Sequence, residues 1–67
     1  MEISEVTSEG AIILFSRYDL EVFHNVLKLI AHEADPERFE AASGSSLIEV
    51  QRMLEKVETT YKRVIEN

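Results

Sequence analysis

Cysteine and tryptophan are absent from this 67-residue chain, which contains only one proline and two glycines. Without cysteine the chain forms no disulfide bond, and the zinc frameworks that are built on cysteine pairs are excluded. The longest strictly apolar run, residues 11–15, is five residues long, whereas about 20 are needed to span a bilayer. The first residues also lack the basic and apolar pattern of a secretory or transit signal. We therefore expect a cytoplasmic protein without a membrane segment.

The short length limits what the chain can bury. Residues 1–67 are expected to form a single domain, and a domain of this size buries roughly 60% of the surface of its unfolded chain. A single core this small rarely contributes more than about 3–5 kcal/mol, so such domains usually need an additional stabilising element. Since disulfides are excluded, the sequence favours self-association, and we expect a homodimer.

Acidic side chains outnumber basic ones by thirteen to seven, which gives a net charge of −6 at pH 7. The excess is concentrated in residues 1–35, whose net charge is −5, against −1 for residues 36–67. An acidic field repels phosphate and attracts basic partners, although salt screens it beyond about 10 Å at 0.1 M. A partner recognised by charge is therefore expected to be a basic protein, and the charge disfavours nucleic acid.

Residues 2–15 have the pattern of a β-hairpin. The segments I-S-E-V and A-I-I-L-F are rich in β-branched residues, and they flank a turn at residues 7–10 that ends in a glycine. The second strand is apolar on both faces. Because an isolated hairpin is marginally stable and its edges stay open to pairing, either the helices or a second copy of the chain must cover it.

Ser16 and Asp19 form the start signal of a long helix, since each side chain can cap the first helical turn. This helix is predicted to run to about Ala34. One apolar stripe consists of Leu20, Phe23, Leu27 and Ile30, and a second stripe beside it consists of Val22, Val26 and Leu29. Together the two stripes cover more of the circumference than one neighbouring helix can bury.

Two further helices are predicted after this one. Residues 35–37, Asp-Pro-Glu, start a short helix that carries Phe39 and Ala42 inward and ends at Gly44. The last helix then presents an apolar seam at heptad spacing, consisting of Leu47, Val50, Leu54, Val57, Tyr61 and Val64. Such a seam suits antiparallel packing against the first long helix. The predicted fold class is α+β, an N-terminal β-hairpin followed by two long helices with a short helix between them.

Residues 39–54 also match the spacing of a helix-turn-helix motif, with Gly44 at the turn, Ser46 at the start of the second helix and Val50 at a core position. The presumed recognition helix begins L-I-E-V-Q-R, however, with no lysine or arginine in its first turn. DNA-binding proteins typically neutralise many phosphates. Gly44 is explained as a helix stop, and Ser46 with Glu49 as a capping box. We therefore interpret the segment as a structural corner.

The sequence offers no residues for catalysis or for a cofactor. It has no cysteine nucleophile, no glycine-rich phosphate loop and no serine in a nucleophile elbow. His24 and His32 are placed on the polar side of the first helix, at exposed or rim positions. They are eight residues apart and about 80° apart around the axis, which rules out a simple local pair of metal ligands. We predict no enzyme and no metal site.

Three short motifs follow one another along the chain, and they are S-R-x-x-L, N-x-L and F-E-x-x-x-G-x-S-x-x-E. They are formed here by Ser16, Arg17, Leu20, Asn25, Leu27, Phe39, Glu40, Gly44, Ser46 and Glu49. In these motifs the chain resembles a group of small bacterial proteins of unknown function, over about residues 15–54. Most of the shared positions are helix caps or core positions, and the resemblance implies no activity, cofactor or binding residue.

The pattern as a whole favours a non-enzymatic, homodimeric protein-protein interaction module. The predicted self-contact surface combines the second strand with the first long helix, and it consists of Ile12, Leu14, Tyr18, Val22, Val26 and Leu29. Two alternatives are open. One is an immunity-type inhibitor, whose acidic face masks a basic toxin. The other is a helix-turn-helix-like regulator that binds nucleic acid through residues 44–52.

Overall fold

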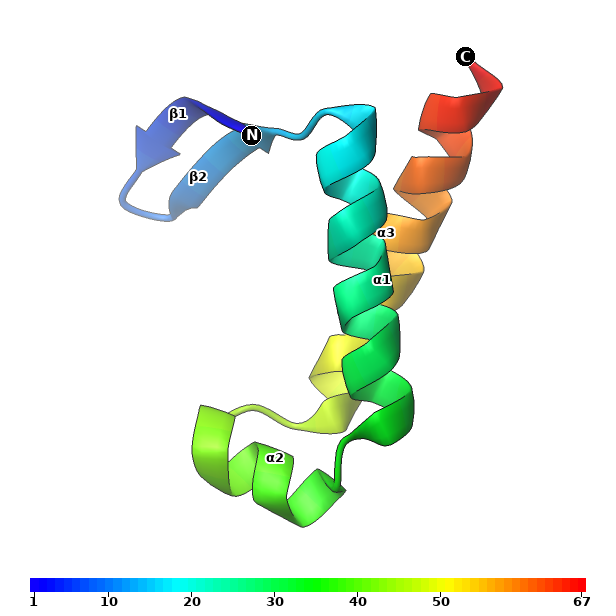
Figure 1. The fold of residues 1–67 in the computed structure, drawn as a ribbon. Coiled ribbons are helices and arrows are strands. Elements are labelled where there is room, and N and C mark those ends of the chain that lie inside the picture. The colour runs from blue at the N-terminus through cyan, green and yellow to red at the C-terminus, as the bar shows by residue number, and fades with distance from the viewer.

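The computed structural model describes all 67 residues. Its elements are β1 (Glu2–Thr7), β2 (Gly10–Leu14), α1 (Arg17–Glu33), α2 (Pro36–Ser43) and α3 (Leu47–Glu66) (Figure 1). The predicted α+β class is confirmed, because an antiparallel hairpin is followed by two long helices with a short helix between them.

The molecule has an open shape. Helices α1 and α3 lie side by side and antiparallel, while the hairpin projects from the start of α1 and α2 projects from the other end, toward the same side (Figure 1). The radius of gyration is 13.4 Å, whereas a compact domain of this length has roughly 11 Å. The molecule measures 37 × 31 × 15 Å along its principal axes, so its shortest dimension is 15 Å.

Local signals in the sequence account for the start of each helix. The Ser16 hydroxyl accepts a hydrogen bond from the backbone N–H of Asp19 at 3.1 Å. At the next helix, Asp35 Oδ1 accepts from the backbone N–H of Glu37 at 3.0 Å, directly before a proline at the first helical position. These caps satisfy donors that have no partner inside the helix, which fixes where α1 and α2 begin.

The corner between α2 and α3 is built from a glycine stop and a serine cap. Gly44 adopts a left-handed conformation with φ of +77°, and its N–H donates to the Glu40 carbonyl at 2.9 Å. Two residues later, the Ser46 hydroxyl accepts from the N–H of Glu49 at 3.3 Å. The predicted end of α2 and the predicted start of α3 are both confirmed.

Gly44 gives a direct test of this corner. Replacing Gly44 with alanine is expected to lower the free energy of unfolding by about 1–2 kcal/mol, because a side chain disfavours the left-handed conformation. A Cβ there meets nothing within 4 Å, so the effect comes from the backbone alone. Gly10→Ala is the matched control, since that site is equally open and φ is not positive. Urea denaturation curves that shift equally for both variants contradict this expectation.

The core of the single chain is very small. Only Leu20, Leu27 and Val50 are buried, and all three lie between α1 and α3. The other predicted seam positions of α3 are partly covered, and they are Leu47, Leu54, Val57, Tyr61 and Val64. The structure therefore places the first predicted stripe of α1 against the seam of α3.

Helix α2 contributes little to this core. It packs loosely on α3 and does not pack on α1. Phe39 is partly covered, but Ala42 is exposed, so the prediction that both side chains point inward is wrong for Ala42. Because α2 has only one loosely packed neighbour, the far side of its short apolar face has nothing to pack against.

Candidate interaction surface

Most of the large apolar side chains of the protein lie at its surface. Thirteen of them are exposed, against three buried residues. Scattered apolar side chains are ordinary on a protein surface, but contiguous groups mark places where another molecule binds. Two such groups are present here, one on α1 and one on the hairpin.

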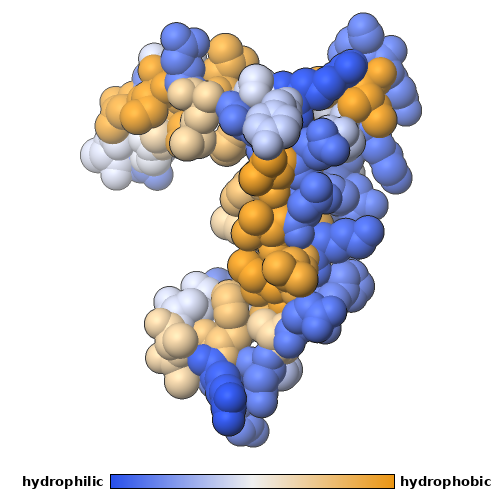
Figure 2. Space-filling view, in the orientation of Figure 1, coloured by the Kyte–Doolittle hydropathy of each residue, from blue (hydrophilic) through white to orange (hydrophobic).

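The first group is the α1 stripe, which we define as Tyr18, Val22, Val26 and Leu29. Their exposed fractions range from 42% to 72%. Figure 2 shows a continuous hydrophobic surface along α1, between the projecting hairpin and the projecting α2. An open hollow of about 510 Å³ lies against the upper part of this stripe, and six of its seven lining residues are hydrophobic. The only acidic side chain in that lining is Asp19.

The second group lies on the hairpin and depends on a β-bulge. The register shifts between Ile3 and Glu5, so that Ser4 is an extra residue in β1. Directly paired residues share a face of the sheet. The paired residues of one face are therefore all apolar, and we define this apolar hairpin face as Ile3, Val6, Ala11 and Ile13. All four are exposed.

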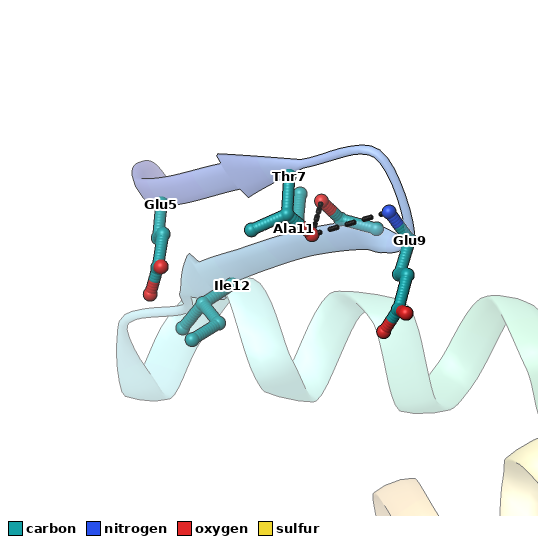
Figure 3. A pocket seen from close by; sticks show the side chains of 6 residues that line it. Glu5, Thr7, Glu9, Ala11 and Ile12 are labelled. Carbon is teal, nitrogen blue, oxygen red and sulfur yellow. Dashed lines mark hydrogen bonds between the residues drawn. The ribbon is translucent and has the colours of Figure 1, made fainter.

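The opposite face of the hairpin is mixed. There Glu2 pairs with Leu14 and Glu5 pairs with Ile12. Figure 3 shows the side chains of Glu5 and Ile12 extending on the same side, around a hollow of about 290 Å³ that Glu9 also lines. No lysine or arginine occurs before Arg17, so this face is acidic as well as partly apolar.

Neither strand packs against a helix of its own chain. The connection between Leu14 and Arg17 is only two residues long, and it is fixed on both sides. The ring of Phe15 stacks on that of Phe23, with centroids 5.5 Å apart and planes 13° apart. Ser16 is held in the helix cap. The hairpin is thus attached firmly at its base and left uncovered along its length.

A third attachment joins the chain end to α1. The Met1 ammonium group donates to Asp19 Oδ2 at 2.6 Å. This ammonium group, and then hydrogen bonding with Ser16, holds the pKa of the Asp19 carboxyl below its ordinary value. The ion pair ties the first strand to the first turn of α1.

The Met1–Asp19 pair is expected to open in acid. Because the pKa is lower in the folded state than in the unfolded state, the pair stabilises the fold above an ordinary Asp pKa of about 3.9 and is lost as pH falls through the folded value. In an NMR titration, the Met1 and Phe15 signals should move below about pH 4. The Asp19→Asn variant should show the acid-form positions already at pH 7, and the neighbouring Glu21→Gln should not. Unchanged signals in Asp19→Asn contradict the attachment.

The two histidines have different surroundings. His32 is exposed, as predicted. His24 lies at the contact between α1 and α3, where its ring stacks on Tyr61 at 5.9 Å, and Nε2 is 3.7 Å from Glu58 Oε2. Only 17% of the His24 side chain is exposed. Placing His24 on the polar side of the helix was wrong, because its position four residues after Leu20 turns it toward α3.

No group of three or more acidic or histidine side chains is arranged to hold a metal ion. No helix is both long and apolar enough to cross a membrane. Comparison with protein-family models, with curated proteins and with solved structures gives no match. The two exposed apolar surfaces are therefore the features of the structure that bear on function.

The structure divides the predicted self-contact residues between two places. The four on α1 form one continuous stripe, whereas Ile12 and Leu14 lie on the mixed face of the hairpin, opposite glutamates. Sequence reasoning did not include the apolar hairpin face. In strict alternation, Ile3 falls on the same side as Glu5, and only the bulge at Ser4 brings it onto the side of Val6.

Proposed function

We propose that this protein is a non-enzymatic, cytoplasmic protein-protein interaction module that acts as a homodimer through the α1 stripe. The observation that carries the proposal is the contrast between a core of three buried residues and the uncovered apolar stripe along α1. A second copy of the chain is present wherever the chain is made, and two-fold dimers are the commonest oligomers.

The energetics agree with this proposal. Fully burying one aliphatic side chain contributes about 1.5–3 kcal/mol. Val22, Val26 and Leu29 are 42%, 46% and 62% exposed, so covering what remains exposed contributes about 2–4.5 kcal/mol per chain. This is comparable with the about 3–5 kcal/mol that a single core of this size provides. Association therefore supplies stabilisation that the isolated chain lacks.

The side chains around the α1 stripe favour a binding interface over a catalytic site. The hollow beside it is lined almost entirely by apolar side chains, and its one carboxylate is already paired with the Met1 ammonium group. A reaction centre needs convergent polar groups with free donors or acceptors. An interface needs an apolar centre with a polar rim.

Light scattering on a sizing column tests the proposal. At low micromolar concentration, the protein should elute as a single species of twice the 7.7 kDa chain mass. A well-folded monomer at that concentration, with full helical circular dichroism, contradicts the homodimer.

The acidic hairpin supports one second candidate, an immunity-type inhibitor that binds a basic protein. Residues 1–15 contain three glutamates and no lysine or arginine, and two of these glutamates line one hollow (Figure 3). Charge complementarity of this kind mainly raises the association rate. This candidate is supported if the affinity for a basic protein falls steeply between about 50 and 500 mM salt. The affinity should also be lost in the double variant Glu5→Gln/Glu9→Gln. Salt-independent binding contradicts it.

A further inference from the structure

We propose that the homodimer forms by exchange of hairpins, with the apolar hairpin face of each chain lying on the α1 stripe of the other. This inference rests on the homodimer proposed above and specifies its geometry. Three features of the structure support it, namely the two unpartnered surfaces, the fixed base of the hairpin and the distribution of charge.

The two apolar surfaces lack partners within the chain and match each other in kind. The apolar hairpin face is a patch of four side chains on a two-stranded sheet, and the α1 stripe is a patch of four side chains on a helix. Packing α1 only against the partner's α1 leaves the apolar hairpin face in water. Laying each hairpin on the partner's α1 covers both surfaces in one contact. This packing also stabilises a two-stranded sheet, which is only marginally stable by itself.

The hairpin is poorly placed to cover the stripe of its own chain. Its connection to α1 consists of Phe15 and Ser16, and both are engaged, one in the stack on Phe23 and the other in the helix cap. The Met1–Asp19 ion pair adds a third attachment beside them. A short, constrained connection favours the exchange of an element between chains over its folding back.

Charge disfavours the competing arrangement in which two hairpins pair with each other. Each hairpin carries Glu2, Glu5 and Glu9 without any lysine or arginine, so edge-to-edge pairing of two hairpins brings six carboxylates close together. The α1 stripe offers a less acidic neighbourhood. Beside Leu29, a hollow of about 380 Å³ is lined by Lys28 and His32 together with one acid, Glu33.

The available apolar area approaches that of an ordinary interface. A fully buried aliphatic side chain corresponds to roughly 60–120 Å² of apolar surface. In each chain, eight side chains take part, and the seven large ones are 40–72% exposed, which gives roughly 240–480 Å² per chain. A standard interface takes about 800 Å² per partner, of which somewhat more than half is apolar.

The geometry also closes under two-fold symmetry. If the hairpin of one chain lies on α1 of the second, the hairpin of the second lies on α1 of the first, and no copy of either surface is left free. The hairpin and α2 project toward the same side of α1 (Figure 1), and they leave the stripe accessible between them (Figure 2).

Cross-linking between single-cysteine variants tests the exchange, and the chain is suitable because it has no cysteine of its own. Val6→Cys labels the apolar hairpin face, and Val26→Cys labels the α1 stripe. One variant is prepared with ¹⁵N, the two are mixed and allowed to exchange subunits, and a short bismaleimide is added. Mass spectrometry then separates mixed products from products of like chains. Ile48→Cys, which is 60% exposed on α3, replaces Val26→Cys in the control mixture.

The expected result is a mixed product from Val6→Cys with Val26→Cys, at least tenfold above that with Ile48→Cys and above either variant alone. Ile3→Cys and Ile13→Cys should repeat it, because they label the same face. Products from Val26→Cys alone indicate helix-to-helix packing, and products from Val6→Cys alone indicate paired hairpins. Either result, or a dimer without any mixed product, overturns the exchange while the homodimer stands. A monomer in light scattering overturns both.

Discussion

Leu29→Glu is expected to convert the proposed homodimer into a monomer. Leu29 is 62% exposed in the single chain and lies within the α1 stripe. In the dimer, the substitution buries an unpaired carboxylate once in each chain, and an unpaired buried charge costs several kcal/mol. Since each 1.4 kcal/mol is tenfold, the dissociation constant should rise at least about 100-fold. Light scattering across a dilution series measures this change directly.

The matched control is Ile48→Glu. It makes the same change of charge at an equally exposed aliphatic residue, 60% exposed, at the start of α3. Ile48 lies on the side of α3 away from the seam by helical spacing, and an acid in a first turn is favourable. This variant should remain a dimer. A dimeric Leu29→Glu, or equal dissociation of both variants, contradicts an interface on the α1 stripe.

Circular dichroism of Leu29→Glu distinguishes the two stripes of α1. The helical signal should be largely retained, because Leu20 and Leu27 supply the contact with α3 and Leu29 lies outside it. Complete loss of helix in the monomeric variant means that the stripe and the core have been assigned the wrong way round.

Leu27→Ala is expected to unfold the free chain. Leu27 is 6% exposed, and only two other residues are buried with it. Truncating a buried leucine to alanine costs about 2–5 kcal/mol, whereas a core of this size rarely contributes more than about 3–5 kcal/mol. Thermal and urea denaturation at low concentration should therefore show little or no cooperative transition for this variant.

Leu29→Ala is the control for Leu27→Ala, because it makes the same truncation two residues away on the exposed stripe. It should weaken association and leave the denaturation of the monomer almost unchanged, since a half-exposed leucine contributes little within its own chain. Equal loss of monomer stability in the two variants contradicts the assignment of Leu27 to the core.

Local chemistry made the helices predictable from sequence. Ser16, Asp35 and Ser46 cap within three residues of themselves, and Gly44 ends α2 through its own backbone, so each boundary follows from a short segment. The seam of α3 was predictable for the same reason, because heptad spacing defines a face without reference to the rest of the chain.

The features that the sequence did not reveal depend on relations between segments. The bulge at Ser4 is a property of the pairing of two strands, and it decides which hairpin face is wholly apolar. The spacing of four residues from Leu20 places His24 toward the core side of α1, but its contact with Tyr61 depends on the packing of α3 beside α1. The direction in which the hairpin leaves α1 is fixed by the two connecting residues, and the hydrophobic periodicity of the sequence does not predict it.

The shortest dimension of the molecule, 15 Å, has a consequence for how the protein behaves in solution. The other two dimensions are 37 and 31 Å, so the chain is flat, and in the proposed homodimer the second copy supplies a further layer. Dilution of the proposed homodimer should therefore lower its thermal stability, while the contact between α1 and α3 remains within each chain. The midpoint of thermal unfolding should rise with protein concentration by mass action, and a single melting temperature has meaning only beside the concentration at which it was measured.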